Sequence, residues 1–381
     1  MKSSVKINSS TPGTVSLSCL LLLATVTFVN AQPNKAFKGY ERLFIQPKHY
    51  VVGYTNRPPV IDGDIDDKIW EAAAWTDEFR DIEGELSSRP LPYYATRAKM
   101  LWDTSYLYIA ADMKDKHVWA NLAKHDEVVY YDNDFEVFID PNNSAQNYFE
   151  IEINALNTIF DLYLAKPYRS GASGMLISWD CKDLLHAVRI QGTLNDPSDE
   201  DRGWTVEMAI PFNSISHQPK DSTLWRFNFS RVEWDVKTVG GKYVKKTGSN
   251  GKPLPENNWV WSPQGAIDMH RPERWAYLMF SKVEAGSVLP EFQLPYSELQ
   301  RRYLWLIFYK QQDWRRKNNT FTDSFKNLKL DSVIYINGIR NAVVIEATSS
   351  QFTALISDSI NSQASVNNYG RAESRNIEIT K

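Results

Sequence analysis

Acidic side chains recur at every second position of two neighbouring segments in this 381-residue chain. Glu136 lies in the segment DNDFEVFID, and Glu150, Glu152 and Asn154 lie in NYFEIEINALN. Because successive side chains of a strand point to opposite faces, this spacing places three carboxylates and an amide on one sheet face. Such a face could accept hydrogen bonds from sugar hydroxyls, or supply a carboxylate pair for glycoside hydrolysis at a separation of ~5 to 9 Å. Like charges on adjacent strands repel unless a hydroxyl-rich ligand, an Arg or a cation offsets them. The remaining interpretation is a solvated face with a neighbouring Lys or Arg.

Tryptophan and tyrosine are abundant, with 13 Trp and 19 Tyr. Their rings fill cores, and they also stack on flat apolar surfaces such as the C–H face of a sugar ring. Trp259 and Trp261 are two residues apart, so on a strand they share one face, where they either stack on a sugar or fill the core. Arg271 follows closely, and its guanidinium is suited to pair with the acidic face and to donate to hydroxyls.

Short segments of alternating apolar and polar residues must position these side chains. Residues 93–113 predict a hairpin, the two acidic segments predict another with a turn at 141–144, and residues 204–212 and 224–234 predict two further strands. Residues 114–131 form a long aromatic-containing loop, which is typical of a functional segment. Many short strands and few helical patterns predict an all-β fold, an antiparallel β-sandwich.

The start of the chain has the pattern of a secretory signal peptide. Lys2 and Lys6 precede an apolar run over residues 15–29, and Ala31 ends it with a small residue. The run is shorter than the ~20 residues of a membrane span. We therefore expect a protein without a membrane span that is secreted or periplasmic, with the signal removed near Ala31.

The rest of the chain divides by its pattern. Residues 289–316 have helical periodicity, and residues 331–347 predict a hairpin around Asn337–Gly338. The expected organisation is a signal peptide over 1–31, a sandwich over 45–284, a helix-plus-hairpin α+β appendage over 289–360 and a polar tail over 361–381. The role of the appendage is open: it either contacts an unknown protein partner or packs as an extension of the sandwich.

Composition excludes several functions. A net charge of −3 with mixed signs argues against nucleic acid or an anionic membrane as the main partner. The sequence lacks the GxSxG, Walker, HExxH and dinucleotide-binding motifs. Removal of the signal leaves Cys181 as the sole cysteine, so no intramolecular disulfide is expected.

Seven motifs, taken in order, resemble carbohydrate-binding module family 9 within the wider DOMON-like group of sandwiches. They span residues 51–280 and read VIDGDIDDKIWEAA, KMLWDTSYLYIAADMKD, NDFEVFIDP, YFEIEINALNT, GWTVEMAIPF, WRFNFSRV and WVWSPQGAIDMHRPERW. The chain is most similar to stand-alone secreted members from polysaccharide-degrading bacteria. The resemblance implies a DOMON-like or jelly-roll-like sandwich that binds a mono- or oligosaccharide, including chain ends, without catalysis. The alternative is a glycoside-active enzyme that uses Glu136 with Glu150 or Glu152.

The resemblance also implies an aromatic clamp around a terminal sugar. By motif, one aromatic falls at Tyr130 or Tyr131, and the other falls at Trp259 or Trp261. The family's binding carboxylate matches Glu136.

The polar face of the next strand adds Glu152 and Asn154 to this implied site. The chain departs from the family in two ways: the first aromatic is Tyr instead of Trp, and Glu152 stands where a basic residue is expected. Both departures concern affinity and sugar specificity.

The resemblance also bears on bound groups. Family members hold structural calcium, with Asp115 and Asp126 as the candidate ligands here, although no cofactor is required. Some DOMON relatives bind haem through Met and His. Met269 and His270 are adjacent, so on a strand they would point to opposite faces, which argues against haem.

Overall fold

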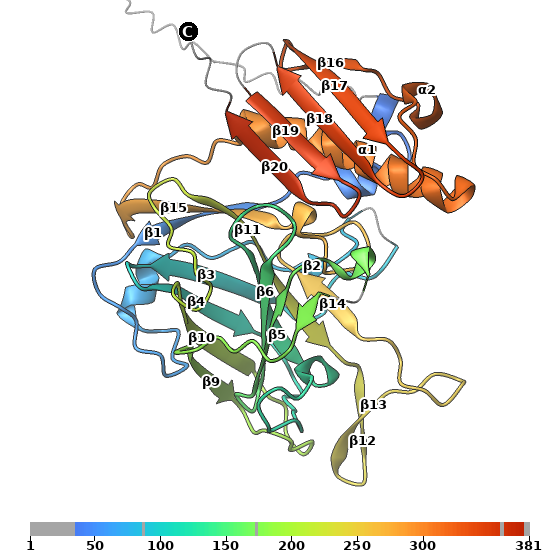
Figure 1. Cartoon of the computed structure of the whole chain (residues 1–381). Helices are drawn as coiled ribbons and strands as arrows, with labels where there is room; N and C mark the ends of the chain where they lie inside the picture. The colour runs from blue at the N-terminus through green and yellow to red at the C-terminus, as the bar shows by residue number, and fades with distance from the viewer. Residues whose placement is uncertain (1–34, 86–87, 172–173, 359–361, 377–381) are drawn as a thin grey trace, which may run out of the picture. The chain divides into compact units, whose positions relative to one another are not determined.

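Segments of alternating apolar and polar residues form the strands of a β-sandwich, as the pattern predicts (Figure 1). The computed structural model describes residues 35–85, 88–171, 174–358 and 362–376, so the predicted signal peptide, residues 1–31, lies outside the described residues. Within those ranges, 13 strands share one hydrogen-bonded sheet system. They are β1 (His49–Tyr54), β2 (Arg80–Asp81), β3 (Thr96–Trp102), β4 (Tyr106–Met113), β5 (Asp134–Asp140), β6 (Tyr148–Asn154), β7 (Ile159–Leu164), β8 (Met175–Leu176), β9 (Leu185–Gln191), β10 (Gly203–Pro211), β11 (Leu224–Glu233), β14 (Asn257–Val260) and β15 (Ala276–Glu284).

The strands form two layers that are connected through β1. The strand order is β8-β7-β6-β5-β11-β15-β1-β3-β4-β10-β9, with β14 beside β11 and β2 beside β14. The pairs are antiparallel except at β1, which runs parallel to β15 and briefly to β3. β1 therefore carries the hydrogen-bonded path from the layer of β5, β6 and β11 to the layer of β3, β4, β10 and β9.

The two layers enclose the main hydrophobic core. β10 contributes the face predicted from its alternation, which consists of Trp204, Val206, Met208 and Ile210. β5 and β6 contribute Phe135, Val137, Ile139, Phe149, Ile151 and Ile153. The opposite faces of β5 and β6 carry the acidic residues, and yet every residue of these two strands is buried. Segments outside the sheet must therefore cover the acidic face.

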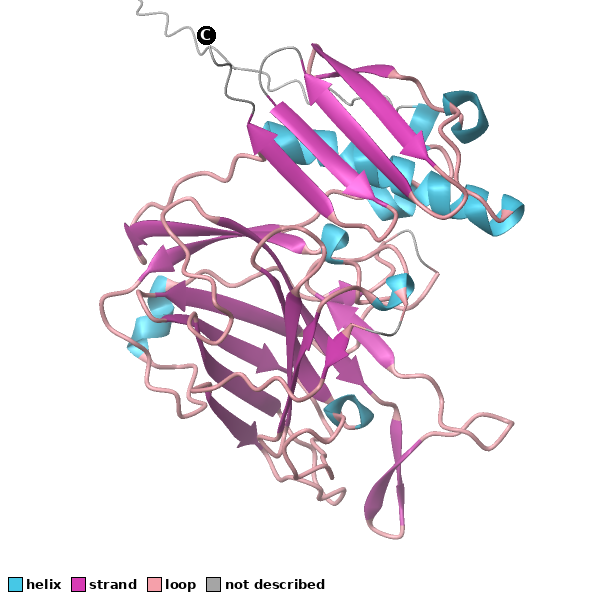
Figure 2. Ribbon diagram, in the orientation of Figure 1, coloured by secondary structure: helices cyan, strands magenta, loops and turns pink. Residues whose placement is uncertain are grey.

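The C-terminal part is a long helix packed on a five-stranded antiparallel sheet (Figure 2). It comprises α1 (Tyr296–Asn318), α2 (Phe325–Leu328), β16 (Val333–Ile336), β17 (Ile339–Ala347), β18 (Phe352–Asp358), β19 (Ser362–Asn367) and β20 (Ala372–Asn376). The predicted hairpin around Asn337–Gly338 forms from β16 and β17. The prediction of an all-β sandwich with a small α+β appendage is confirmed.

The predicted polar tail, residues 361–381, differs from the structure. Residues 362–376 form β19 and β20 and complete the sheet of the appendage. Ala364, Val366 and Ala372 are buried in the cluster that α1 covers, while their polar neighbours face outward. These small apolar residues alternate with polar ones, and they form strands here because β18 offers a sheet edge for pairing and α1 covers the apolar face.

Buried contacts connect α1 to other segments. Phe44 belongs to the same hydrophobic cluster as Leu304 and Phe308 of α1. Arg226 on β11 forms a buried salt bridge of 2.9 Å with Glu298 of α1. The described 3-10 helices are η1 (Lys35–Phe37), η2 (Glu41–Phe44), η3 (Lys68–Ala72), η4 (Val129–Tyr131), η5 (Tyr168–Ser170) and η6 (Pro272–Arg274).

Residues 236–257, which are rich in Lys and Gly, contain a two-stranded hairpin of β12 (Val236–Val239) and β13 (Lys242–Lys245). In the part of the chain that the structure describes, no helix is long and apolar enough to cross a membrane.

Candidate functional site

A cleft of about 370 Å³ lies over the acidic face of β5 and β6. Its walls come from the loop before β5, the excursion between β7 and β9, and the loop before β15. The residues that line it are Val128, Tyr130, Glu136, Phe138, Glu150, Glu152, Phe160, Tyr168, Met175, Ile177, Val232, Asn258, Met269 and His270. The structure thus brings together four residues of the sequence-based site, namely Tyr130, Glu136, Glu150 and Glu152.

Strand pairing explains why the glutamates meet. Glu136 of β5 lies opposite Glu152 of β6, and Glu150 lies opposite Phe138. Asp134 has the same parity as Glu136 in β5, so it joins them on this face. On the other side of β5, Ser230 of β11 lies opposite Glu136. The floor therefore contains one more carboxylate than the sequence-based site includes.

The environment of these four carboxyl groups disfavours their charge. Asp134, Glu136, Glu150 and Glu152 are each at most 6 % exposed. Burial raises the pKa of Glu136 to about 7. Burial, and then the charge of neighbouring carboxylates, raises the pKa of Asp134, Glu150 and Glu152 well above the ordinary range. Four adjacent buried carboxylates cannot all stay ionised at neutral pH without a counter-charge.

Two tyrosines provide aromatic walls. Tyr130 lies in η4, and its ring centroid is 4.5 Å from that of Tyr131. Tyr131 is 53 % exposed and lies outside the cleft lining. Tyr168, at the start of η5, has its ring centroid 4.1 Å from that of His270. Burial, followed by the charges of Glu150 and Glu152, raises the pKa of Tyr168, which agrees with its place above these carboxylates.

Trp259 and Trp261 share one face of their segment, as predicted from their spacing, but that face packs into the hydrophobic core. Both side chains are at most 2 % exposed and belong to the main hydrophobic cluster. Trp259 faces the guanidinium of Arg231 from the core side of β14. The neighbouring residue, Asn258, lines the cleft instead. The expectation of a Trp clamp is therefore corrected, because the pleat directs these two rings inward.

Asn154 and Arg271 are also corrected. The Asn154 amide donates to the Leu122 carbonyl and to Asp132, and its oxygen accepts from two backbone N–H groups, so it organises a turn. Arg271 pairs with Asp268 at 3.0 Å and lies over the Tyr309 ring, outside the cleft lining. Arg271 therefore does not balance the acidic face, because its loop turns it toward α1.

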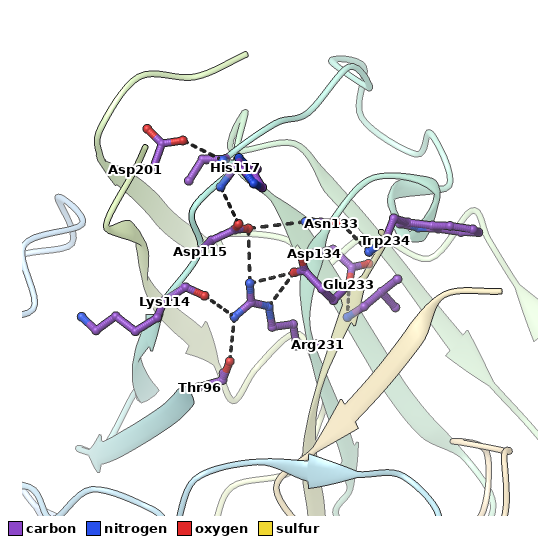
Figure 3. A network of polar contacts seen from close by, with 12 residues as sticks. Thr96, Lys114, Asp115, His117, Asn133, Asp134, Asp201, Arg231, Glu233 and Trp234 are labelled. Atoms are coloured by element: carbon purple, nitrogen blue, oxygen red, sulfur yellow. Dashed lines mark hydrogen bonds and ion pairs between the residues drawn. The ribbon is translucent and has the colours of Figure 1, made fainter. Parts of the chain in front are cut away.

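Asp115 belongs to a buried ion network around Arg231 (Figure 3). One oxygen of Asp115 accepts from the His117 backbone N–H, and the other lies 3.3 Å from the Arg231 guanidinium. Arg231 also binds Glu233 at 2.7 Å and the hydroxyl of Thr96 at 2.9 Å. Both oxygens of Asp115 have protein donors, and a cation lies beside them, so this residue does not fit a calcium ligand.

Asp126 has a different environment. One atom each of His125, Asp126 and Asp161 lies within 4.8 Å of the others. Asp161 is buried, and one of its oxygens lacks a hydrogen bond in the described structure. This set fits a divalent cation, although calcium usually takes oxygen ligands only. Calcium at Asp126 stays a prediction.

Met269 and His270 both line the cleft, which corrects the premise that they point to opposite faces. Their segment is a loop instead of a strand. His270 Nδ1 lies 2.9 Å from the Tyr148 hydroxyl, and burial lowers its pKa to about 4. The adjacent buried carboxylates make the cleft unfavourable for the anionic propionates of haem.

Sequence reasoning does not assign Tyr168, Ser230 or Asn258 to the site, and it considers His270 only as a haem ligand. The local sequence around these residues does not indicate that they reach the cleft, because segments far apart in the chain bring them there. Asp134 is different, since its spacing from Glu136 already places it on the acidic face.

The family model "carbohydrate family 9 binding domain-like" matches residues 61–259, which is more than half of the chain. The chain therefore belongs to this family of carbohydrate-binding sandwich domains. The resemblance drawn from the seven motifs is confirmed.

Among curated proteins, the chain is similar to the exoglucanase XynX of Acetivibrio thermocellus, with 36% identity over 158 residues. It is also similar to endo-1,4-beta-xylanase A of Thermoanaerobacterium saccharolyticum, with 30% identity over 170 residues. The matches cover 42% and 45% of this chain but only 12% of each relative.

Among solved structures, a family 9 carbohydrate-binding module from Caldicellulosiruptor kristjanssonii is similar at 20% identity and a TM-score of 0.40. The match covers 65% of this chain and 100% of that structure, a complex with cellotriose.

Proposed function

We propose that this protein binds carbohydrate in the cleft over β5 and β6 without acting on it, in support of polysaccharide degradation. The observation that carries the proposal is the shared cleft: hydroxyl acceptors on its floor and tyrosines in its walls. The family match supports the same function independently of this geometry. The signal pattern over residues 1–31 supports a secreted or periplasmic location.

Each part of the cleft has a role in this proposal. The rings of Tyr130 and Tyr168 offer faces to the apolar side of a sugar ring. Glu136 accepts hydrogen bonds from hydroxyls, and the protonated members of the carboxyl cluster can also donate. Asn258 adds an amide that both donates and accepts. A neutral His270 adds bulk without charge, because burial keeps its pKa low.

The relatives suggest which sugars to test first. Their names are endo-1,4-beta-xylanase and exoglucanase, and this chain matches only a small part of each. We therefore propose β-1,4-linked xylo- and gluco-oligosaccharides as ligands.

Hydrolysis is the alternative function for the same carboxylates. A glycosidase needs one carboxyl that stays protonated and one that stays ionised across the scissile bond. Burial raises the pKa of all four carboxyls, that of Glu136 to about 7 and those of the other three well above the ordinary range, so none is held ionised well below neutral pH as a nucleophile or base would be. This favours binding.

Calorimetric titration of the mature protein with xylo- and cello-oligosaccharides tests the proposal. We expect the substitutions Glu136→Gln and Tyr168→Ala each to weaken binding about tenfold or more, since each removes a hydrogen-bond acceptor or a stacking face. Tyr335→Ala is the matched control, because Tyr335 is an exposed tyrosine of β16. Product analysis of the same samples tests hydrolysis. Binding that is absent for every glycan, or that is equal in all variants, contradicts the proposal.

A further inference from the structure

The carboxylates on the cleft floor lack a basic partner. Among the residues that the structure describes, no Lys, Arg or His forms an ion pair with Asp134, Glu136, Glu150 or Glu152, while buried carboxylates elsewhere do. Arg231 follows Ser230 in β11, but it points to the opposite face and pairs with Glu233. Burying a carboxylate without a partner is costly, so the floor requires protons or a cation.

The geometry of three of these groups fits a cation. Asp134, Glu136 and Glu152 each offer one oxygen, and these oxygens lie within 4.8 Å of one another. Calcium binds oxygens at 2.3–2.6 Å, so two ligands on one ion lie at most about 5 Å apart. The separations of the three oxygens are therefore compatible with their binding one ion together.

A second, independent observation comes from β11. The Ser230 side chain is 1 % exposed, and its hydroxyl has no hydrogen-bond partner in the described structure other than the carboxyl group of Glu136 beside it. Its residue lies opposite Glu136 in the strand pairing. One oxygen each of Asp134 and Glu152 also lacks a partner. A shared proton would satisfy one pair of oxygens, whereas a central ion satisfies all of these atoms at once.

We propose that Asp134, Glu136, Glu152 and the Ser230 hydroxyl bind one calcium-like divalent cation, and that hydroxyls of the bound sugar complete its coordination. The oxygen-only donor set selects a hard cation over zinc or copper. Glu136 and Glu152 line the cleft, and Asp134 lies two positions before Glu136 on the same face of β5 and is fully buried. An ion bound to all three is in reach of a ligand in the cleft, because two of its ligands line that cleft. The second half of the inference rests on the proposed function, and the first half does not.

The test uses the mature protein after treatment with a chelator. Calcium chloride is titrated by calorimetry, and terbium chloride is titrated by luminescence sensitised by nearby tyrosines such as Tyr130. We expect one ion at this site in the wild type and at least a tenfold loss of ion affinity in Asp134→Asn. Ser230→Ala is the second variant, because it keeps all carboxylates and removes one ligand.

Asp126→Asn is the control that separates this site from the cluster of His125, Asp126 and Asp161. Asn tolerates the positive φ of 66° at this position. We expect Asp126→Asn to bind the ion at Asp134 with wild-type affinity, whereas Asp134→Asn loses that affinity. Ion binding that is absent in the wild type, or that is equal in wild type, Asp134→Asn and Ser230→Ala, overturns the inference.

The two proposals fail separately. Sugar binding that is unchanged by the chelator would keep the carbohydrate proposal and remove the role of the ion in it. Ion binding at Asp134 without binding of any glycan would keep the metal site and reject the carbohydrate proposal. We expect both to hold, with at least a tenfold weaker sugar affinity after chelation.

Discussion

The parity of a single residue decides whether a side chain of β11 or β14 meets the cleft or the core. Ser230 lies opposite Glu136 on the cleft face, and Arg231, one position further, lies in the buried ion network. Asn258 lines the cleft, while Trp259 fills the core. A shift of one residue in the pairing of either strand would exchange these roles and dismantle the site.

His270 makes the clearest prediction about pH at the residue scale. It is packed by Phe138, Tyr148 and Tyr168, with Asp268 and Arg169 as nearby charges, and burial lowers its pKa to about 4. The unfolded chain therefore binds more protons than the folded protein between about pH 6.5 and 4. Stability from this group is present above that window and is lost as the pH falls through it.

Urea unfolding between pH 7.5 and pH 4 checks this prediction against His270→Asn, which keeps a hydrogen-bonding group without a charge change. As the pH falls over this range, we expect the free energy of unfolding of the wild type to decrease by about 2 kcal/mol more than that of the variant. The carboxyl groups are the same in both proteins, so the difference between the two profiles reports His270 and its interaction with Asp268. Parallel profiles would refute the prediction.

At the scale of elements, the ion network around Arg231 fixes the end of β11 against the start of the loop after β4. Arg231 is fully buried and binds Glu233, Asp115, Thr96 and the Lys114 carbonyl. The same loop continues to Tyr130 and so positions one wall of the cleft. Loss of the guanidinium leaves two buried carboxylates without a cation.

We expect Arg231→Met to lower the free energy of unfolding by about 3–5 kcal/mol, measured by urea denaturation. Arg189→Met is the matched control, because Arg189 on β9 pairs with Asp64 at an exposed position and should cost less than about 1 kcal/mol. Similar losses in both variants would show that the network is not a determinant of stability.

At the scale of the whole molecule, the appendage is connected to the sandwich by buried polar contacts. Glu298 at the start of α1 accepts from Arg226 and from the Tyr277 hydroxyl, both at 2.9 Å. Tyr309 and Arg169 both bind Glu273. These contacts favour the packing role for the appendage.

We therefore expect Glu298→Leu alone to cost about 3–5 kcal/mol, because it leaves Arg226 buried and unpaired. The double variant Arg226→Met with Glu298→Leu should cost clearly less than the sum of its single variants, in a double-mutant cycle by urea unfolding. Glu291→Gln, at an exposed position before α1, is the control. Additive losses would show that the pair is not coupled.

The sequence alone determines the strands that carry the acidic face, the parity of their residues and the family. The spacing of Glu136, Glu150 and Glu152 sets a shared face, since period two is a local property of the strand. The order of seven motifs is sufficient for the family. The same parity also places Trp259 and Trp261 on one face.

Only the tertiary structure decides which face is inside and what covers the other. Packing of the two layers takes Trp259 and Trp261 into the core, and a distant excursion brings Tyr168 over the glutamates. Arg271 pairs with Asp268 instead of the acidic face. These outcomes depend on contacts between segments far apart in the chain, and no local pattern encodes such contacts. The same packing leaves four carboxylates buried together, which makes the cleft floor a candidate cation site.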